Sequence, residues 1–110
     1  EAHLKTRKSW IAFGKHLAGE LCVDEGCLAA MREGASLLAV GVTAVYGAFS
    51  AGETVRVLSP DGQEIARGIA AYGAADIGRL MGHQTAEFHA LVADALHEEI
   101  IHRDNMVLMV

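Results

Sequence analysis

Histidine and acidic side chains are the residues of this chain whose chemistry could hold a metal ion or act as acid and base. Four histidines stand in its second half, separated by six, eight and five residues: His83, His89, His97 and His102. No two of them lie at positions i and i+4, where a helix would present both imidazoles to one metal ion. Glu98 and Glu99 are expected to form a solvated charge pair rather than a general acid and base. The spacing therefore predicts no metal site and no catalytic pair.

The two cysteines, Cys22 and Cys27, are too few for the disulfide framework of a small secreted domain. Cys22 ends a predicted strand and Cys27 opens a predicted helix, so both are expected to be buried, small hydrophobic side chains. Free thiols favour a reducing, cytoplasmic compartment. No apolar run approaches the roughly 20 residues that span a bilayer, so no membrane partner is predicted.

The run His102-Arg103-Asp104-Asn105 begins like the catalytic loop of protein kinases. In that loop a metal-binding asparagine stands five residues after the aspartate, and Met109 occupies this position here. The chain also has no glycine-rich nucleotide loop, and 110 residues are too few for a two-lobed kinase. We therefore interpret the run as an Asp-Asn turn between two terminal strands. No catalytic and no cofactor-binding residue is predicted.

Composition and charge indicate one folded domain with an acidic body. Hydrophobic residues make up 52% of the chain, which argues against disorder, and 12 glycines against one proline indicate many tight turns. The net charge is −5, but the first sixteen residues carry +3, which leaves −8 for the remainder. Nucleic-acid-binding modules usually show a basic footprint, so this acidic body disfavours tight RNA binding.

The segment from Val23 to Val42 predicts a strand, a short capped helix and a second strand. Asp24 is a good N-cap, because its carboxylate can accept the free amide hydrogens of the next turn. Leu28 and Met31 form a narrow apolar stripe at helical spacing, and Gly34 is placed to adopt the left-handed conformation at the helix end. Such a short helix is marginal alone, so tertiary packing must hold it.

Turn signals and apolar patterns divide the rest of the chain into short elements. Ser59-Pro60-Asp61-Gly62 has the residue order of a tight turn and predicts a hairpin. The run Val42–Phe49 is apolar on both faces, which favours a central strand. Trp10-Ile11-Ala12-Phe13 is expected to pack against the β structure as a first apolar anchor. The other predicted elements are strands at Glu20–Val23, Glu53–Leu58, Gln63–Ile69, Glu99–His102 and Met106–Val110, and helices at Ala74–Met81 and Thr85–Leu96.

Many short strands with turn signals about every ten residues indicate a mainly β fold, a closed or pseudo β-barrel with about three short α-helices. In the second strand of the hairpin, Ile65, Arg67 and Ile69 share a face if the strand is regular, which places Arg67 among apolar neighbours. A β-bulge at Gly68 would turn Arg67 outward. The alternative is an inward-facing, functional arginine.

Several separate motifs resemble one known family, in the same order along the chain. The run from Val23 to Val42, with Asp24, Gly26, Gly34 and the Leu37-Leu38 pair, is similar to the core motif of the PUA domain. The flanking motifs narrow the resemblance to the PUA domains at the C-terminus of bacterial glutamate 5-kinases. These motifs include Gly52-Glu53, Pro60–Gly68, Gly82-His83 and Ile101–Asn105, and the similarity extends from about Arg7 to Met109.

The resemblance implies a PUA-like barrel over residues 10–110 and, over residues 1–9, a linker from a missing amino-acid-kinase domain. That domain would bind ATP, Mg²⁺ and glutamate, carry a proline feedback site, and form L-glutamyl 5-phosphate in proline biosynthesis. No cofactor is expected in the residues at hand, so this domain is expected to be non-catalytic, with a regulatory or architectural role. Its expected partners are its own kinase domain or a neighbouring subunit of a homo-oligomer, in the cytoplasm.

RNA is the alternative partner that the resemblance implies, since many PUA domains bind RNA. In those domains the helix after the first strand, the glycine-rich turn that follows and a neighbouring strand form the contact surface. The matching positions here are Arg32, Gly34, Ser36, Arg67 and Tyr72. Two of them have structural alternatives, because Arg32 can pair with the helix dipole and Tyr72 can belong to the core.

Overall fold

A five-stranded mixed sheet is the centre of the fold in the computed structural model, which describes residues 2–14 and 16–109, with side chains from residue 6 onward. The strands follow the order β2-β1-β3-β4-β5; β1 and β3 are parallel, and the other neighbours are antiparallel. Their bounds are β1 Gly19–Val23, β2 Val42–Gly47, β3 Thr54–Leu58, β4 Glu64–Ile69 and β5 Met106–Leu108. The predicted mainly β class is confirmed.

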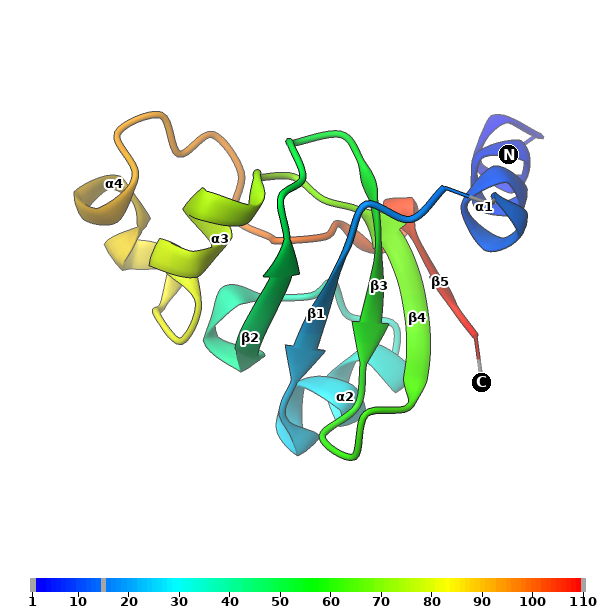
Figure 1. The fold of residues 1–110 in the computed structure, drawn as a ribbon, viewed down its shortest axis with the longest axis horizontal. Coiled ribbons are helices and arrows are strands. Elements are labelled where there is room, and N and C mark those ends of the chain that lie inside the picture. Colours follow the sequence, from blue (N-terminus) through cyan, green and yellow to red (C-terminus); the bar gives the residue numbers. More distant parts are fainter. Residues whose placement is uncertain (1, 15, 110) are drawn as a thin grey trace.

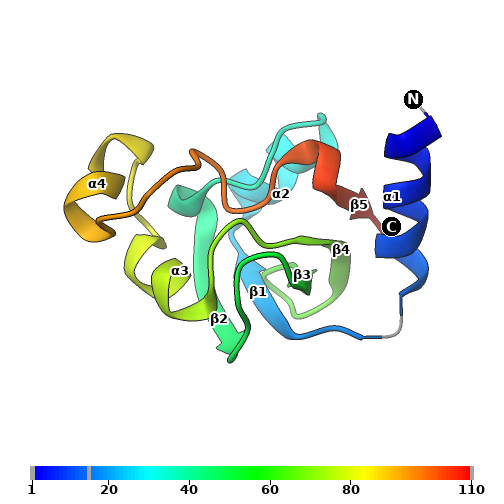
Figure 2. The same ribbon diagram turned by 90° about the horizontal axis from the view of Figure 1, so that it is seen from above.

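Helices stand at both ends of this sheet and below it. The α-helices are α1 Ala2–Phe13, α2 Glu25–Arg32, α3 Ala74–Leu80 and α4 Phe88–Leu91. Figures 1 and 2 show α1 beside β5 and α3 with α4 at the opposite end, beyond β2. The sequence predicted about three helices, and α1 is the additional one, in the segment expected to be a linker. The domain boundary at residue 9 stays a prediction, and Glu1 lies outside the described residues. No helix in the described part of the chain is both long and apolar enough to cross a bilayer.

The sheet is not closed, since no ladder joins its edge strands β2 and β5 within the described residues, and it fits the pseudo-barrel form of the prediction. A single bridge between Leu37 and Ile101 ties the segment after α2 to the C-terminal segment. The prediction that Val42–Phe49 forms a central strand is wrong, since β2 is an edge. The helix α3 packs against β2, and a Cβ added at Gly78 would lie 3.9 Å from Val45 Cγ1. An apolar pattern indicates which faces of a strand are covered, but it does not show whether both of its edges pair with other strands.

The predicted helix after Val23 is confirmed. The Asp24 carboxylate accepts the backbone N–H of Cys27 at 2.8 Å, which caps α2. Leu28 and Met31 are buried against the sheet, and Gly34 ends the helix with a φ of +95°. Local capping signals and a short apolar stripe therefore suffice to place this element.

The hairpin between β3 and β4 is also confirmed, but its bulge lies at another residue. Gly62 N–H donates to the Ser59 carbonyl at 2.9 Å and closes the turn. Val57 pairs with Ala66, whereas Leu58 pairs with Glu64, so Ile65 is the extra residue of the bulge. Because the bulge precedes Arg67 instead of coinciding with Gly68, Ile65 and Ala66 are both buried and Arg67 turns away from the core.

The C-terminal third contains less regular structure than its patterns predict. The predicted helix Thr85–Leu96 is wrong beyond Leu91, because Val92 adopts an extended conformation (φ −135°, ψ 115°) and the chain leaves the helix there. Leu96 is 85% exposed instead of completing an apolar stripe. The predicted strand Glu99–His102 reduces to the bridge at Ile101, and the last strand is β5; Val110 lies outside the described residues.

Gly78 offers a direct test of the packing between α3 and β2. Replacing this exposed helix residue with alanine is expected to stabilise the domain by about 0.5–1 kcal/mol, because alanine favours the helix and the new Cβ meets only Val45 Cγ1 at 3.9 Å. Urea unfolding followed by circular dichroism measures the change. Gly82→Ala is the control, since Gly82 has a φ of +81° and alanine there should destabilise by about 1 kcal/mol. A destabilised Gly78→Ala variant would mean that α3 lies closer to β2 than described.

Candidate functional site

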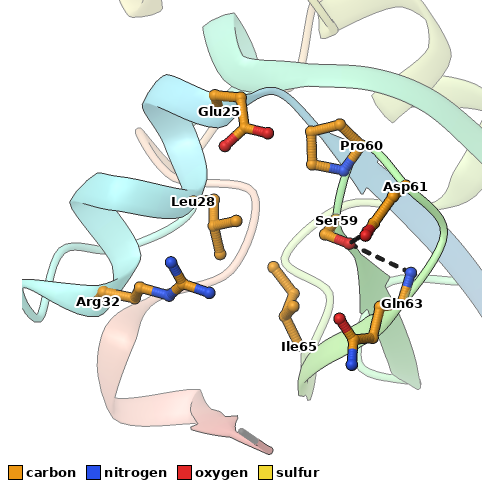
Figure 3. Close-up of a pocket in the computed structure, with 8 residues that line it drawn as sticks. All are labelled: Glu25, Leu28, Arg32, Ser59, Pro60, Asp61, Gln63 and Ile65. Carbon is orange, nitrogen blue, oxygen red and sulfur yellow. Dashed lines mark hydrogen bonds between the residues drawn. The ribbon is translucent and has the colours of Figure 1, made fainter.

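The first candidate site is an open pocket of about 440 Å³ between α2 and the β3–β4 turn (Figure 3). Arg32 extends into it from the last turn of α2, and the carboxylates of Glu25 and Asp61 lie on its rim. Its other lining residues are Leu28, Ser59, Pro60, Gln63 and Ile65. The pocket therefore combines one positive and two negative groups over an apolar floor.

The β3–β4 turn holds its carboxylate in the ionised form. The Ser59 hydroxyl donates a hydrogen bond to Asp61 and accepts the Gln63 backbone N–H at 3.1 Å. The hydroxyl of Ser59 lowers the pKa of the Asp61 carboxyl below its ordinary value. A phosphate that approached Arg32 here would meet the negative charge of Asp61, so this pocket suits a ligand of mixed charge better than a polyanion.

Gly34 and Ser36 lie near the same end of α2 but line two other pockets. A cavity of about 350 Å³ includes Gly34 together with Lys8 of α1 and Arg103. Ser36 lines an apolar cavity of about 280 Å³ on another side of α2, and its hydroxyl accepts the Arg103 backbone N–H at 2.8 Å. Arg32, Gly34 and Ser36 thus lie near the end of one helix but line three separate pockets.

Arg67 is occupied by structural contacts. Its guanidinium forms an ion pair with Glu64 and donates to the Ala12 carbonyl of α1 at 3.1 Å. The hydrogen bond from Arg67 lowers the pKa of the Glu64 carboxyl, and the charges of Arg67 and Arg56 act in the same direction. Arg67 therefore attaches α1 to the sheet and is separate from the residues around the end of α2.

Tyr72 is a core residue, the alternative noted from the sequence. Its ring is buried and meets Phe88 and His97 edge to face, at centroid distances of 6.1 and 5.8 Å. Its hydroxyl donates to the His97 carbonyl and accepts the His97 N–H at 2.9 Å. The ring has no free face on which a base could stack.

Two basic residues of this region are not indicated by any motif in the sequence. Lys8 lies in the expected linker and Arg103 in the expected turn, yet both line the cavity at Gly34. Arg32 and Arg103 make no ion pair with another described residue, whereas Arg56, Arg67 and Arg79 each pair with a carboxylate. No local signal could reveal this grouping, because Lys8 and Arg103 come from opposite ends of the chain.

The remaining side chains with chemical potential have structural roles. Burial, and secondarily the charge of Asp24, raise the pKa of the Cys27 thiol to about 11, so it is a poor nucleophile at neutral pH. His102 accepts the Asp104 N–H at 3.0 Å and caps a 3₁₀ turn at Arg103–Asn105, which confirms the turn interpretation. Among the side chains that the structure describes, in residues 6–14 and 16–109, no three of His, Cys, Asp or Glu converge as metal ligands.

The contacts of Arg67 predict a pH-dependent effect. Arg67→Met is expected to destabilise the domain by about 1 kcal/mol at neutral pH. This is the usual contribution of a charged hydrogen bond that solvent partly screens. Because the pKa of Glu64 is lowered below 4.5 in the folded state, this contribution is present above pH 4.5 and is lost as the pH falls through the lowered pKa. Urea unfolding at several pH values and carboxyl NMR titration of Glu64 measure both effects. Arg79→Met, which removes an exposed pair with Asp76, is the control and should change little. An unchanged Glu64 pKa in Arg67→Met would contradict the assignment.

The chain is similar to one family of domains and to several known proteins. The sequence model of the PUA domain matches residues 19–92. Glutamate 5-kinase 1 of Mesorhizobium japonicum is 48% identical over 105 residues, which are 96% of this chain and 28% of that protein. The chain thus spans little more than a quarter of the length of this curated relative.

Two solved structures share the fold. A PUA domain from Aeropyrum pernix, solved as a tartrate complex, has a TM-score of 0.58 and 24% identity, over 84% of this chain and 46% of that chain. The archaeal box H/ACA sRNP Nop10–Cbf5 complex has a chain with a TM-score of 0.52 and 21% identity, over 57% of this chain and 20% of that chain. Both likenesses support the mainly β pseudo-barrel.

Proposed function

The chain belongs to the PUA domain family, and we propose that it is the non-catalytic C-terminal domain of a glutamate 5-kinase, with a regulatory or architectural role. The similarity over 96% of the chain to glutamate 5-kinase 1 of Mesorhizobium japonicum is the observation that carries this proposal. The longer protein would transfer the γ-phosphate of ATP to L-glutamate in proline biosynthesis, in the cytoplasm.

The chain covers 28% of the length of this relative, so the proposal assigns ATP, Mg²⁺ and glutamate to the upstream part of the longer protein. The partners of this domain would be that part or a neighbouring subunit of a homo-oligomer.

Deletion of this domain from the full-length protein tests the proposal. We expect the full-length protein to phosphorylate L-glutamate with ATP, and the truncated protein to retain that reaction with altered ATP, glutamate or proline titrations. Steady-state kinetics and light scattering of both proteins measure catalysis, inhibition and oligomeric state. If the ATP, glutamate and proline titrations and the oligomeric state are the same with and without the domain, the proposed regulatory or architectural role is wrong.

RNA binding is the second candidate function, favoured by one observation. Lys8 and Arg103 line the cavity at Gly34, and Arg103 and Arg32 are free of ion pairs within the described part of the chain. The net charge of −5 and the occupied side chains of Arg67 and Tyr72 oppose it. Binding to a structured RNA at low salt, weakened by Arg103→Gln and by added salt, would support it. Absence of any salt-sensitive shift would eliminate it.

A further inference from the structure

Two aromatic side chains on α1 lie exposed on a helix that is itself attached to the domain. Trp10 is 75% exposed and Phe13 is 81% exposed, whereas Ile11 between them is only 3% exposed. Residues three apart on a helix are neighbours on one face, so Trp10 and Phe13 form one aromatic patch. The prediction that Trp10-Ile11-Ala12-Phe13 packs against the β structure is therefore corrected. Ile11 packs on the domain, whereas the side chains of Trp10 and Phe13 are exposed.

The contacts of α1 show that the patch is held in place. The Arg7 guanidinium donates to the Asn105 side chain at 2.6 Å, and Arg67 donates to the Ala12 carbonyl at 3.1 Å. With buried Ile11, these bonds attach the middle of the helix to the segment before β5 and its C-terminal end to β4. In Figures 1 and 2, α1 stands at the β5 end of the molecule, away from α2, α3 and α4. Trp10 and Phe13 are therefore presented on a fixed helix.

We infer that Trp10 and Phe13 are the anchor by which this domain docks on the upstream catalytic part of the longer protein. This inference rests on the proposed function. Large aromatic side chains are the commonest anchors of protein interfaces, because each buries a large area with little loss of conformational freedom. The helix α1 precedes the PUA match at residue 19, so it lies in the segment that would join the two parts.

The size of the patch favours a tethered partner over a free one. Two aromatic side chains bury about 300–500 Å² together, well below the roughly 1,200 Å² of a stable interface between separate proteins. A covalent connection raises the effective concentration to about millimolar, at which a small interface is populated. A second copy of this chain or a diffusing protein would lack that advantage.

Hydroxyl-radical footprinting with mass spectrometry tests this docking residue by residue. The full-length protein is compared with the present chain alone, and the modification of Trp10 and Phe13 is expected to be largely lost in the full-length protein. Leu96 is the internal control, because it is 85% exposed and follows α4, which stands at the end of the domain opposite α1, so it should react equally in both. In the full-length protein, Trp10→Ala with Phe13→Ala should speed proteolysis between the two parts, and Trp10→Phe should not.

The other outcomes separate the alternatives. Equal modification of Trp10 and Phe13 in both proteins overturns the inference. If Trp10 and Phe13 of the isolated chain become more protected as the chain concentration rises, the patch binds a second copy of the chain. If they are protected only when RNA or anionic vesicles are added, the patch binds that ligand. Either result overturns the docking inference. If the full-length protein does not phosphorylate glutamate, the proposed function fails whatever the footprint. If it phosphorylates glutamate while Trp10 stays reactive, only the docking inference fails.

Discussion

Replacing Gly68 with alanine is expected to destabilise the domain by about 3 kcal/mol, at the upper end of the usual effect of overpacking. A Cβ at this position would lie 2.6 Å from Ile101 Cγ2 and 2.9 Å from the Asn105 carbonyl oxygen. Ile101 is fully buried, and the Asn105 carbonyl belongs to the backbone that leads into β5, so neither can move freely. Denaturant unfolding monitored by circular dichroism measures the loss.

Gly26→Ala is the matched control for this substitution. Gly26 lies in the first turn of α2, where a new Cβ would meet only Asp24 Oδ1 at an ordinary 3.6 Å. That variant should be as stable as the wild type or more stable by up to about 1 kcal/mol. If both variants were equally stable, β4 and the Ile101–Asn105 segment would not approach each other as described. The close approach matters for the candidate site, because the Ile101–Asn105 segment contacts other parts of it. Arg103 bonds to Ser36, and Asn105 accepts a hydrogen bond from Arg7.

The elements that the sequence predicted well are those with complete local signals. Asp24, the Leu28–Met31 stripe and Gly34 define both ends and the buried side of α2, and all three features are present in the structure. The Ser59–Gly62 turn likewise specifies its hairpin from four adjacent residues. In both cases the physical cause lies within one or two turns of chain, so no knowledge of distant partners is needed.

Elements whose environment comes from distant residues were predicted less well. The apolar run of β2 favours a central strand, but apolar side chains do not show whether both edges of a strand are paired, and β2 pairs only with β1 among the described strands. The direction of Arg67 depended on a bulge, which the sequence analysis placed at Gly68 and the structure places at Ile65. Gly68 is instead required by the close approach of Ile101, a contact between residues far apart in the chain.

The candidate site shows the same division. Arg32, Gly34 and Ser36 all lie near the end of α2, but they line three different pockets. Tyr72 and Arg67 were separated from them by contacts with His97 and Ala12 that no local pattern encodes. The exposed aromatic patch on α1 was missed for a related reason: four consecutive apolar residues suggest an anchor, but helical geometry buries only one side of them.

Leu37 and Leu38 are adjacent in the sequence, and truncating Leu37 is expected to destabilise the domain far more than truncating Leu38. Leu37→Ala should destabilise the domain by about 3 kcal/mol, because the Leu37 side chain is fully buried and its removal leaves a cavity. Its backbone bonds, from Leu37 N–H to the Ile101 carbonyl at 2.9 Å and from Ile100 N–H to the Leu37 carbonyl at 2.8 Å, do not depend on the side chain. Urea unfolding therefore measures the packing contribution of the side chain.

Leu38→Ala provides the control, because this side chain is exposed and lines the apolar cavity that also contains Ser36. Its truncation should change stability by less than about 0.5 kcal/mol. Comparable losses for both variants would show that the segment after α2 is seated differently, with Leu38 also in the core. The expected contrast has a functional consequence: Leu37 fastens this segment to Ile101, and that attachment leaves Leu38 and Ser36 at the surface beside α2. Leu38→Ala should therefore weaken the binding of any ligand of this surface without changing the stability of the domain. A loss of binding in this variant can then be distinguished from unfolding.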